Sequence, residues 1–176
     1  YVILRNLLEW KKKKKGAMDF EPESFNISDV LDPIIETSLT RCEQKGISLI
    51  STIEPEISLL ADKKMVNSIL MNLISNAIKF TSRGGSVSVS GKTINDSTIE
   101  ISVTDTGIGM TKDKLKKLFK LGEKTKSEGT DGELSTGLGL MLCKEFVEKN
   151  GGKIRVESKP GIGSKFYFTL RKSKGT

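Results

Sequence analysis

The sequence has no histidine, only two cysteines and no long apolar segment. Without histidine, this chain cannot by itself form a Ser-His-Asp triad or a histidine-ligated metal site. Cys42 and Cys143 each lie in an apolar helical pattern, so we expect buried free thiols rather than a disulfide or a metal site. No apolar run approaches the roughly 20 residues that span a bilayer, and no secretory signal is visible. These absences favour a cytoplasmic domain that makes no membrane contact.

The positive charge is concentrated in one place. The net charge is +7, and five of these charges come from the lysine run at residues 11–15. A nucleic-acid-binding protein would spread its basic residues over a face, with stacking aromatics between them. A single basic run near one end is typical of a solvated segment instead. We therefore expect no nucleic-acid binding.

The length suits one domain with a short segment before it. At 176 residues, one domain can bury a core without disulfide or metal staples. Residues 1–10 carry apolar residues at helical spacing and indicate the end of a helix, and the lysine run and Gly16 follow as a linker. We expect residues 1–18 to be this helix remnant and linker, and residues 19–176 to be the folded domain.

Helical and strand periodicities follow one another without strict alternation. Ser28 is the expected N-cap of a first helix that Gly46 ends, and Asp62 is the expected N-cap of a second. Residues 138–149 predict a third helix. Alternating residues predict a strand at 47–53, a hairpin around Asn95-Asp96-Ser97 and two strands within 153–170, and a long polar loop covers 121–135. The prediction is an α+β fold, a two-layer sandwich with a mixed, mainly antiparallel sheet covered on one face by about three helices.

Three polar residues line one side of the predicted second helix. Asn72, Asn76 and Lys79 are spaced by four and three residues, at the margin of the apolar stripe. They could simply be the solvated flank of that helix. Asparagine carbonyl oxygens are also hard, neutral ligands for Mg²⁺, which takes few protein ligands, and Lys79 would then meet phosphate charge. The spacing alone leaves both interpretations open.

Two glycine-rich segments have patterns that suit a nucleotide. Asp105 follows a strand and could accept a hydrogen bond from an exocyclic amine, while Gly107 and Gly109 would let the backbone approach a base. Aspartate and glycine are also ordinary turn residues. Residues 135–146 place a glycine-rich turn at a helix start, where N–H groups favour phosphate. That turn is not a Walker loop, since G-K-[ST] is absent. The turn at 161–164 is most simply a hairpin turn.

Taken together and in this order, these segments resemble the sensor histidine kinases. The segments NLISNAIKF (72–80), DTGIGM (105–110), LF (118–119), TGLGL (136–140) and GIGS (161–164) are similar to that family's asparagine, first glycine, phenylalanine and second glycine boxes and its terminal glycine turn. The resemblance covers about residues 20–170. It implies the GHKL-type ATP-binding catalytic domain of a two-component sensor kinase, which transfers the γ-phosphoryl of ATP to a histidine on a dimerisation domain, for relay to a response regulator.

The resemblance also implies roles for single residues. Asn76 would be the Mg²⁺ ligand and, with Lys79, catalytic, while Asp105 would bind the adenine amine. Residues 120–136 would form the ATP lid. The residues to which the resemblance assigns contacts with ATP or its Mg²⁺ are Asn72, Asn76, Lys79, Phe80, Asp105, Gly107, Gly109, Thr136, Gly137, Leu138 and Gly139.

Two positions bear on this assignment. Ser135 stands where the second glycine box usually begins with glycine, which affects the lid geometry more than nucleotide binding. In the related ATPases, a glutamate general base occupies the position of Asn72, and an amide cannot take a proton from water at neutral pH. A kinase is therefore favoured. A GHKL-type ATPase and a non-catalytic nucleotide-binding module stay open as alternatives.

The missing histidine also determines the expected partners. Because the phosphoacceptor cannot lie within this chain, the resemblance implies that it lies on a separate dimerisation domain, the first partner. The second partner is a response-regulator receiver domain. The family dimerises through that missing domain, so we expect this chain to be a monomer, whether or not the parent protein is membrane-anchored.

Overall fold

The structure is a computed structural model that describes residues 20–54, 56–119, 129–132 and 138–173. The predicted helix remnant and linker and most of the predicted lid lie outside the described residues. The elements in chain order are β1 (Pro22–Asn26), α2 (Ser28–Lys45), β2 (Ser48–Ser51), β3 (Ser58–Asp62), α3 (Lys63–Phe80), β4 (Ser86–Asn95), β5 (Thr98–Asp105), α4 (Lys112–Lys117), α5 (Gly139–Lys149), β6 (Ile154–Lys159) and β7 (Gly163–Lys172). None of the described helices is long and apolar enough to cross a bilayer.

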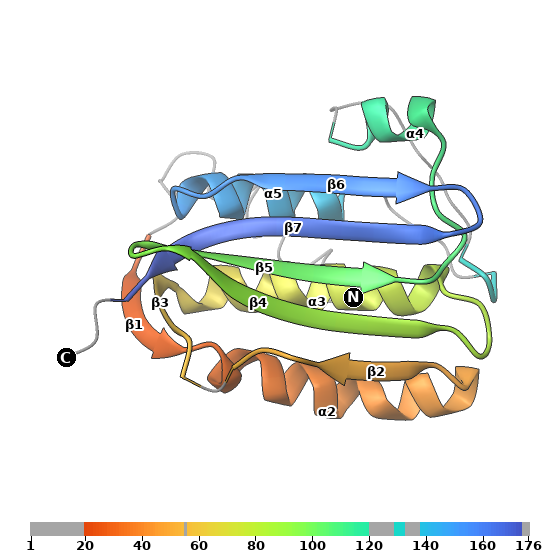
Figure 1. Ribbon diagram of the computed structural model, residues 1–176, viewed down its shortest axis with the longest axis horizontal. Helices are drawn as coiled ribbons and strands as arrows, with labels where there is room; N and C mark the ends of the chain where they lie inside the picture. The colour runs from red at the N-terminus through yellow and green to blue at the C-terminus, as the bar shows by residue number, and fades with distance from the viewer. Residues whose placement is uncertain (1–19, 55, 120–128, 133–137, 174–176) are drawn as a thin grey trace, which may run out of the picture.

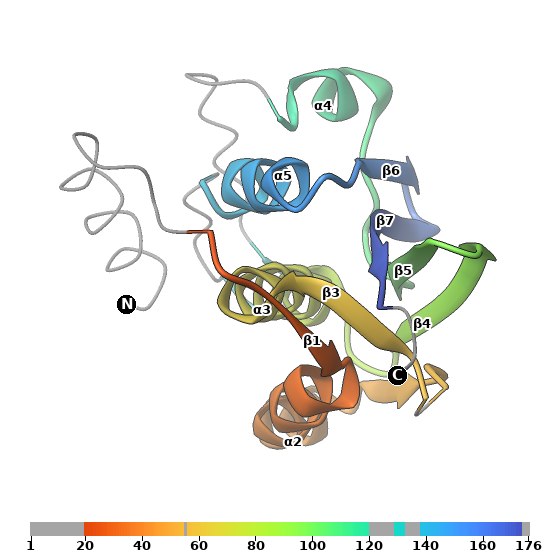
Figure 2. The ribbon, with the colours of Figure 1, turned by 90° about the vertical axis from the view of Figure 1, so that its left-hand side faces the viewer.

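The strands form one mixed sheet of seven strands. Its order is β1-β3-β7-β5-β4-β2, with β6 paired to β7, and every pairing is antiparallel except β2 with β4 (Figure 1). Helices α2, α3 and α5 lie together on one side of this sheet (Figure 2). The predicted two-layer α+β sandwich, mainly antiparallel and covered by three helices, is confirmed. The short helix α4 lies at the β6 edge of the molecule (Figure 1).

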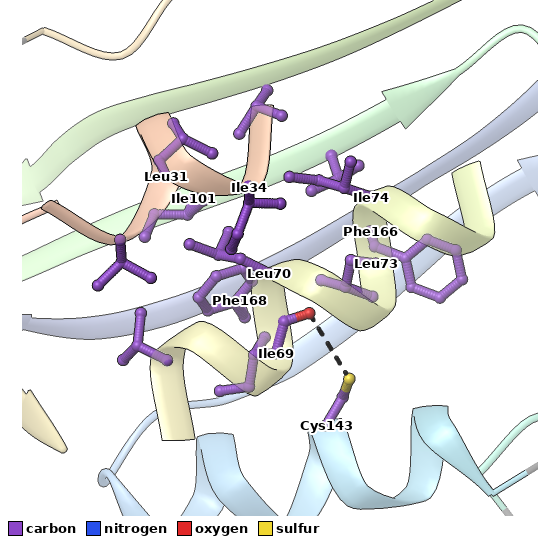
Figure 3. Close-up of a cluster of buried hydrophobic side chains, with 14 of the residues drawn as sticks. Leu31, Ile34, Ile69, Leu70, Leu73, Ile74, Ile101, Cys143, Phe166 and Phe168 are labelled. Carbon is purple, nitrogen blue, oxygen red and sulfur yellow. Dashed lines mark hydrogen bonds between the residues drawn. The ribbon is translucent and has the colours of Figure 1, made fainter. Parts of the chain in front are cut away.

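Helix α3 forms the centre of the core. Ten of its 18 residues are buried, among them Ile69, Leu70 and Leu73, which belong with Phe168 of β7 to one cluster of buried side chains (Figure 3). Each such side chain stabilises the fold by roughly 1.5–3 kcal/mol relative to remaining exposed. Cys143 of α5 contacts α3, with its Sγ 3.9 Å from the carbonyl oxygen of Ile69. The central place of α3 fixes the position of every polar residue that it carries.

The helix ends agree with the sequence at two of three positions. Asp62 caps α3 by accepting a hydrogen bond from the Met65 N–H at 3.0 Å, and Gly46 ends α2 in the left-handed conformation with φ 58°. The prediction of Ser28 as the N-cap is wrong, because Ser28 is already the first helical residue. Ile27 occupies the N-cap position without a side-chain cap, and Asn26 Oδ1, two residues before the helix, accepts the Ser28 N–H at 2.8 Å.

The β4–β5 hairpin and the β5–β7 pairing place the end of β5 beside the start of β7. The predicted hairpin is confirmed, with Asn95 paired to Thr98 across the turn. At the other end of β5, Asp105 pairs with Ser164 of β7. The end of β5 therefore meets the β6–β7 turn, and the candidate site is built there.

Both cysteines are free and buried, as predicted. Burial raises the pKa of the Cys143 thiol to about 12. Burial also raises the pKa of Cys42, partly offset by the nearby Arg41. Neither thiol is therefore prepared to act as a nucleophile near neutral pH.

Candidate functional site

Asp105 lies at the end of β5 and is buried, with 7% of its surface exposed. Its Oδ1 accepts two backbone hydrogen bonds, from the Gly107 N–H at 2.9 Å and from the Ser164 N–H at 3.2 Å. Burial raises the pKa of Asp105 above its usual value, and the two backbone hydrogen bonds oppose this shift.

The second oxygen of Asp105 has a different environment. Within the described residues, Oδ2 accepts no hydrogen bond. No buried side-chain oxygen in that part of the chain lacks a partner, so Oδ2 is open to solvent. The carboxylate is thus fixed by one oxygen and presents the other as a hydrogen-bond acceptor.

Positions 107 and 109 have no room for a side chain, because the backbone of other segments lies too close to them. A Cβ on Gly107 would lie 2.3 Å from the carbonyl oxygen of Phe80, which accepts the Ile108 N–H at 3.0 Å. Gly109 has φ 66°, and a Cβ there would lie 2.0 Å from the carbonyl oxygen of Lys159. The glycines therefore let the Asp105 turn pack against the end of α3 and against the end of β6. Their contact with a base stays a prediction.

The β6–β7 turn supports Asp105. Gly163 has φ 129°, and a Cβ there would lie 1.9 Å from the carbonyl oxygen of Asp105. Ser158 Oγ accepts the Met110 N–H at 2.9 Å, which ties the far end of the Asp105 turn to β6. The residues at 161–164 predicted a hairpin turn, which the resemblance identified as the family's terminal glycine turn. The Ser164 N–H was not singled out, because its partner is 59 residues away in sequence.

Asn72 of α3 lies against Gly139, the first residue of α5. It is buried, and its Nδ2 donates to the Ser68 carbonyl oxygen at 3.0 Å. With the NH₂ group committed, Oδ1 faces the start of α5, since a Cβ on Gly139 would lie 2.7 Å from it. Asn76 is partly exposed one turn further along α3, and within the described residues its carboxamide makes no hydrogen bond.

The C-terminal end of α3 brings three further groups together. Lys79 is buried, and its Nζ lies 5.4 Å from the centroid of the Phe80 ring. Lys114 of α4 approaches the same ring, with its Nζ at 5.7 Å. These are cation–π contacts on a partly exposed aromatic ring. The carbonyl of Lys79 accepts the Thr130 N–H at 3.1 Å, so residues 129–132 also contact this end of the helix.

The four candidate residues around the start of α5 are only partly described. Thr136 and Gly137 lie outside the described residues. Leu138 is at the N-cap position without a side-chain cap, and Gly139 is the first helical residue, beside Asn72. The structure therefore places the predicted phosphate-binding helix end next to the predicted asparagine box.

The polar groups of this region suit an oxygen-ligated ion better than a zinc-type centre. No group of three or more Cys, Asp or Glu side chains that could hold a metal exists in the part of the chain that the structure describes. Asn72 and Asn76 supply carbonyl oxygens from one face of α3, which are the ligands that Mg²⁺ prefers.

One buried cation near this site was missed by the sequence reasoning. Lys45, the last residue of α2, is 3% exposed, and its Nζ donates to Thr130 Oγ1 at 2.7 Å. The only sequence signal was a lysine before a helix-ending glycine, which is commonly a solvated residue at a helix C-terminus.

Solved structures of known proteins share this arrangement of elements. The structure of full-length ShkA in complex with AMPPNP matches with a TM-score of 0.81 and 26% identity, covering 99% of this chain and 36% of that one. The structure of the histidine kinase ThkA in complex with the response regulator protein TrrA matches with a TM-score of 0.75 and 22% identity, covering 98% of this chain and 47% of that one. The second likeness shows the shared fold alone.

Sequence comparison identifies the family. The hybrid signal transduction histidine kinase L of Dictyostelium discoideum is 35% identical over 181 residues, which cover 98% of this chain and 10% of that protein. The chain thus spans only a small part of the length of this curated relative. The family profile described as histidine kinase-, DNA gyrase B- and HSP90-like ATPase matches residues 61–174. This match covers more than half of the chain, which therefore belongs to the family of histidine kinase-, DNA gyrase B- and HSP90-like ATPases.

Proposed function

We propose that this chain is the ATP-binding catalytic domain of a two-component sensor histidine kinase and acts in the cytoplasm. It would transfer the γ-phosphoryl group of ATP to a histidine on a separate dimerisation domain, and a response-regulator receiver domain would take the group onward. The observation that carries the proposal is the Asp105 carboxylate, held by two backbone N–H groups through one oxygen and open to solvent at the other.

The open oxygen of Asp105 suits adenine. A carboxylate oxygen only accepts hydrogen bonds, so it matches the exocyclic amine of adenine and mismatches the carbonyl at the corresponding edge of guanine. The backbone of Phe80, whose ring is partly exposed, lies against the Asp105 turn, because the Phe80 carbonyl accepts the Ile108 N–H at 3.0 Å. We propose that this ring lines the nucleotide, and that Gly107 and Gly109 keep the turn close enough to contact the base.

The asparagines of α3 fit Mg²⁺. Asn76 has a partly exposed carboxamide without a hydrogen bond in the described residues, and Asn72 directs its Oδ1 toward the start of α5. Mg²⁺ takes one or two protein oxygens and keeps phosphate oxygens and waters. We propose Asn76 as the ligand, with Asn72 beside it. When bound, the ion would neutralise charge on the ATP phosphates.

The phosphates would meet positive charge from two directions. The Lys79 ammonium lies beside Phe80 at one end of α3. The N-terminus of α5 carries partial positive charge, and we propose the backbone N–H groups at its start, those of Leu138 and Gly139, as phosphate donors. Positioning and charge stabilisation are the main requirements of phosphoryl transfer, so these groups need no acid or base chemistry of their own.

Transfer to histidine needs little help from a base on this chain. A neutral imidazole nitrogen already has a lone pair, which attacks the γ-phosphorus while the bond to the β–γ bridging oxygen breaks and ADP leaves. A water molecule as attacking group would need a proton acceptor, and Asn72 stands where the family's ATPases have a glutamate. This position favours a kinase over an ATPase.

The named relatives support the same function. A relative of this chain is a signal transduction histidine kinase, and a solved neighbour of similar fold holds AMPPNP, an analogue of ATP. Another neighbour of similar fold is in complex with a response regulator. By analogy, we propose ATP as the ligand of this chain and a response-regulator receiver domain as a partner.

Two measurements test the proposal. Calorimetry with ATP and ADP in the presence of Mg²⁺ should show binding, and its absence at millimolar nucleotide would reject the assignment. With [γ-³²P]ATP, label should appear on an added histidine-bearing dimerisation domain of the parent protein, through an acid-labile bond, and not on this chain. ATP binding without transfer would identify a non-catalytic module, and rapid release of inorganic phosphate by the chain alone would identify an ATPase.

A further inference from the structure

Lys45 makes contacts that the proposed function does not use. Its Nζ donates hydrogen bonds to the carbonyl oxygens of Ile78 at 3.1 Å and Lys79 at 3.3 Å, and to Thr130 Oγ1 at 2.7 Å. The Asp131 carboxylate lies 4.0 Å from the same ammonium. The side chain comes from the last residue of α2, a helix that carries none of the residues predicted for the candidate site.

The Lys45 ammonium lies where negative charge surrounds it, at the carbonyl oxygens that end α3 and near the Asp131 carboxylate. The last carbonyls of a helix carry partial negative charge and have no partner within the helix, so a cation there is stabilised. A lysine that is 3% exposed would be costly without such partners. Lys45 therefore has its charge held between the end of α3 and the short segment at residues 129–132.

Thr130 joins the same two parts of the chain. Its N–H donates to the Lys79 carbonyl at 3.1 Å. Its hydroxyl accepts from Lys45 and lies 3.2 Å from the Lys79 carbonyl and 3.1 Å from the Thr81 carbonyl, to either of which it can donate. Residues 129–132 are thus held against the backbone of Lys79. The side chain of Lys79 is the one that we propose contacts the ATP phosphates.

We propose that Lys45 is a positioning residue for nucleotide binding. It fixes residues 129–132 on the C-terminal end of α3 and so holds the backbone of Lys79 and Phe80 in the geometry that binds ATP. Lys45 does not touch the nucleotide, and it acts through Thr130 and the α3 carbonyls. This inference rests on the proposed function, because it assigns a task to Lys45 only if Lys79 and Phe80 contact ATP.

Lys45→Met tests the inference, with Lys63→Met as the matched control. Lys63 also joins α2 to α3, through Asp29 at 3.6 Å, but at the opposite end of α3. We expect Lys45→Met to weaken ATP binding about tenfold, the size of one charge-assisted hydrogen bond, and Lys63→Met to leave it within twofold. Amide exchange at the Thr130 N–H should become faster in Lys45→Met and stay unchanged in the control.

A second variant keeps the test decisive if Lys45→Met does not fold. Thr130→Val removes the hydroxyl but keeps the shape, and it should also weaken ATP binding severalfold. In the double variant the effect should be smaller than the sum of the two single effects, because both changes break the shared contact between Lys45 and the Thr130 hydroxyl. A folded Lys45→Met or Thr130→Val with a lower thermal midpoint and unchanged ATP affinity would overturn the inference. Failure of the unmodified chain to bind ATP would reject the proposed function as well.

Discussion

Asp105→Asn separates nucleotide recognition from support of the local turn. Asparagine can keep an oxygen at the Oδ1 position, where the N–H groups of Gly107 and Ser164 need an acceptor. The reverse orientation would bring its NH₂ group against two donors and is therefore disfavoured. The substitution thus replaces only the open Oδ2 oxygen, by an NH₂ group that cannot accept a hydrogen bond from adenine.

The expected magnitude follows from this exchange. The lost interaction is one charged hydrogen bond, about 1.5–3 kcal/mol, so the Kd for ATP should rise about tenfold to a hundredfold. The fold should be affected much less, because both backbone hydrogen bonds to Oδ1 are kept. Calorimetric affinity for ATP and the thermal midpoint without nucleotide measure the two effects separately.

The pH dependence gives a second, independent readout. Burial raises the pKa of Asp105 above its usual value, so the folded state binds this proton more tightly than the unfolded state. Its contribution to the free energy of unfolding should therefore fall as pH rises from the unfolded-state pKa of about 3.9 through the raised pKa. Asp105→Asn should remove this decline and leave the protein no less stable at neutral pH.

Glu100→Gln is the matched control for this experiment. Glu100 is also a buried carboxylate of β5, but it pairs with Arg155 at 3.1 Å and Lys92 at 3.3 Å, outside the candidate site. The control should alter stability and leave ATP affinity unchanged. If Asp105→Asn instead lowers the thermal midpoint and binds ATP as tightly as the unmodified chain, Asp105 only stabilises its own turn and the adenine assignment is wrong.

Three further predictions concern other parts of the chain. Gly107→Ala should lower stability by about 1–3 kcal/mol in chemical denaturation and weaken ATP binding, because its Cβ would lie 2.3 Å from the Phe80 carbonyl oxygen. Cys143, with a pKa of about 12, should react with thiol reagents at pH 8 only after unfolding, and rapid labelling of the native chain would contradict the structure. Burial acts to raise the pKa of Glu100, but hydrogen bonds from Arg155 and Lys92 lower it overall. Arg155→Gln should therefore lower the free energy of unfolding above about pH 4.3, where Glu100 is ionised in both states. This loss should disappear as the pH falls through the lowered pKa of Glu100, and denaturant midpoints of the two proteins measured against pH would show it.

The long regular elements were predictable because their signals are local. Helix α3 carries a wide apolar stripe and begins at an aspartate cap, and both features lie within its own sequence. The β4–β5 hairpin likewise joins neighbouring segments through a short polar turn. Periodicity and turn chemistry are sufficient in such cases.

The short elements were not predictable on the same grounds. Strand β3 has only five residues, and its inward positions, Leu59 and Ala61, give too brief an alternation. Strand β1 is stabilised by pairing with β3, so its signal lies in another segment. Helix α4 has six residues, none of them buried, and it begins at the capping hydroxyl of Thr111. The parallel pairing of β2 with β4 depends on contacts between distant segments, which one sequence does not show.

The candidate site was predictable in its residue types but not in its support. The sequence indicated Asn72, Asn76 and Lys79 by their spacing and Asp105 by its glycine-rich turn. The structure places Asn72 in the middle of α3 beside the start of α5, with Asn76 and Lys79 further along α3, and Asp105 at the end of β5. Lys45 carries no such signal, because its hydrogen-bond partners lie 33 to 85 residues away in the sequence. The predicted polar loop at residues 121–135 falls mostly outside the described residues and stays a prediction.

The end of α3 also determines the order in which the chain can complete its fold. The Ala77 carbonyl is satisfied locally by the Thr81 hydroxyl at 2.7 Å, but the next three carbonyls receive their donors from Lys45, Ile108 and Thr130. Those donors lie before and after α3 in the sequence. No single continuous segment of the chain therefore contains all the hydrogen-bond donors that the last turn of α3 needs. Contacts of long sequence separation form late and slowly. We expect this last turn to be among the last parts to gain protection during refolding, and a nascent chain that stops before residue 130 to leave it frayed.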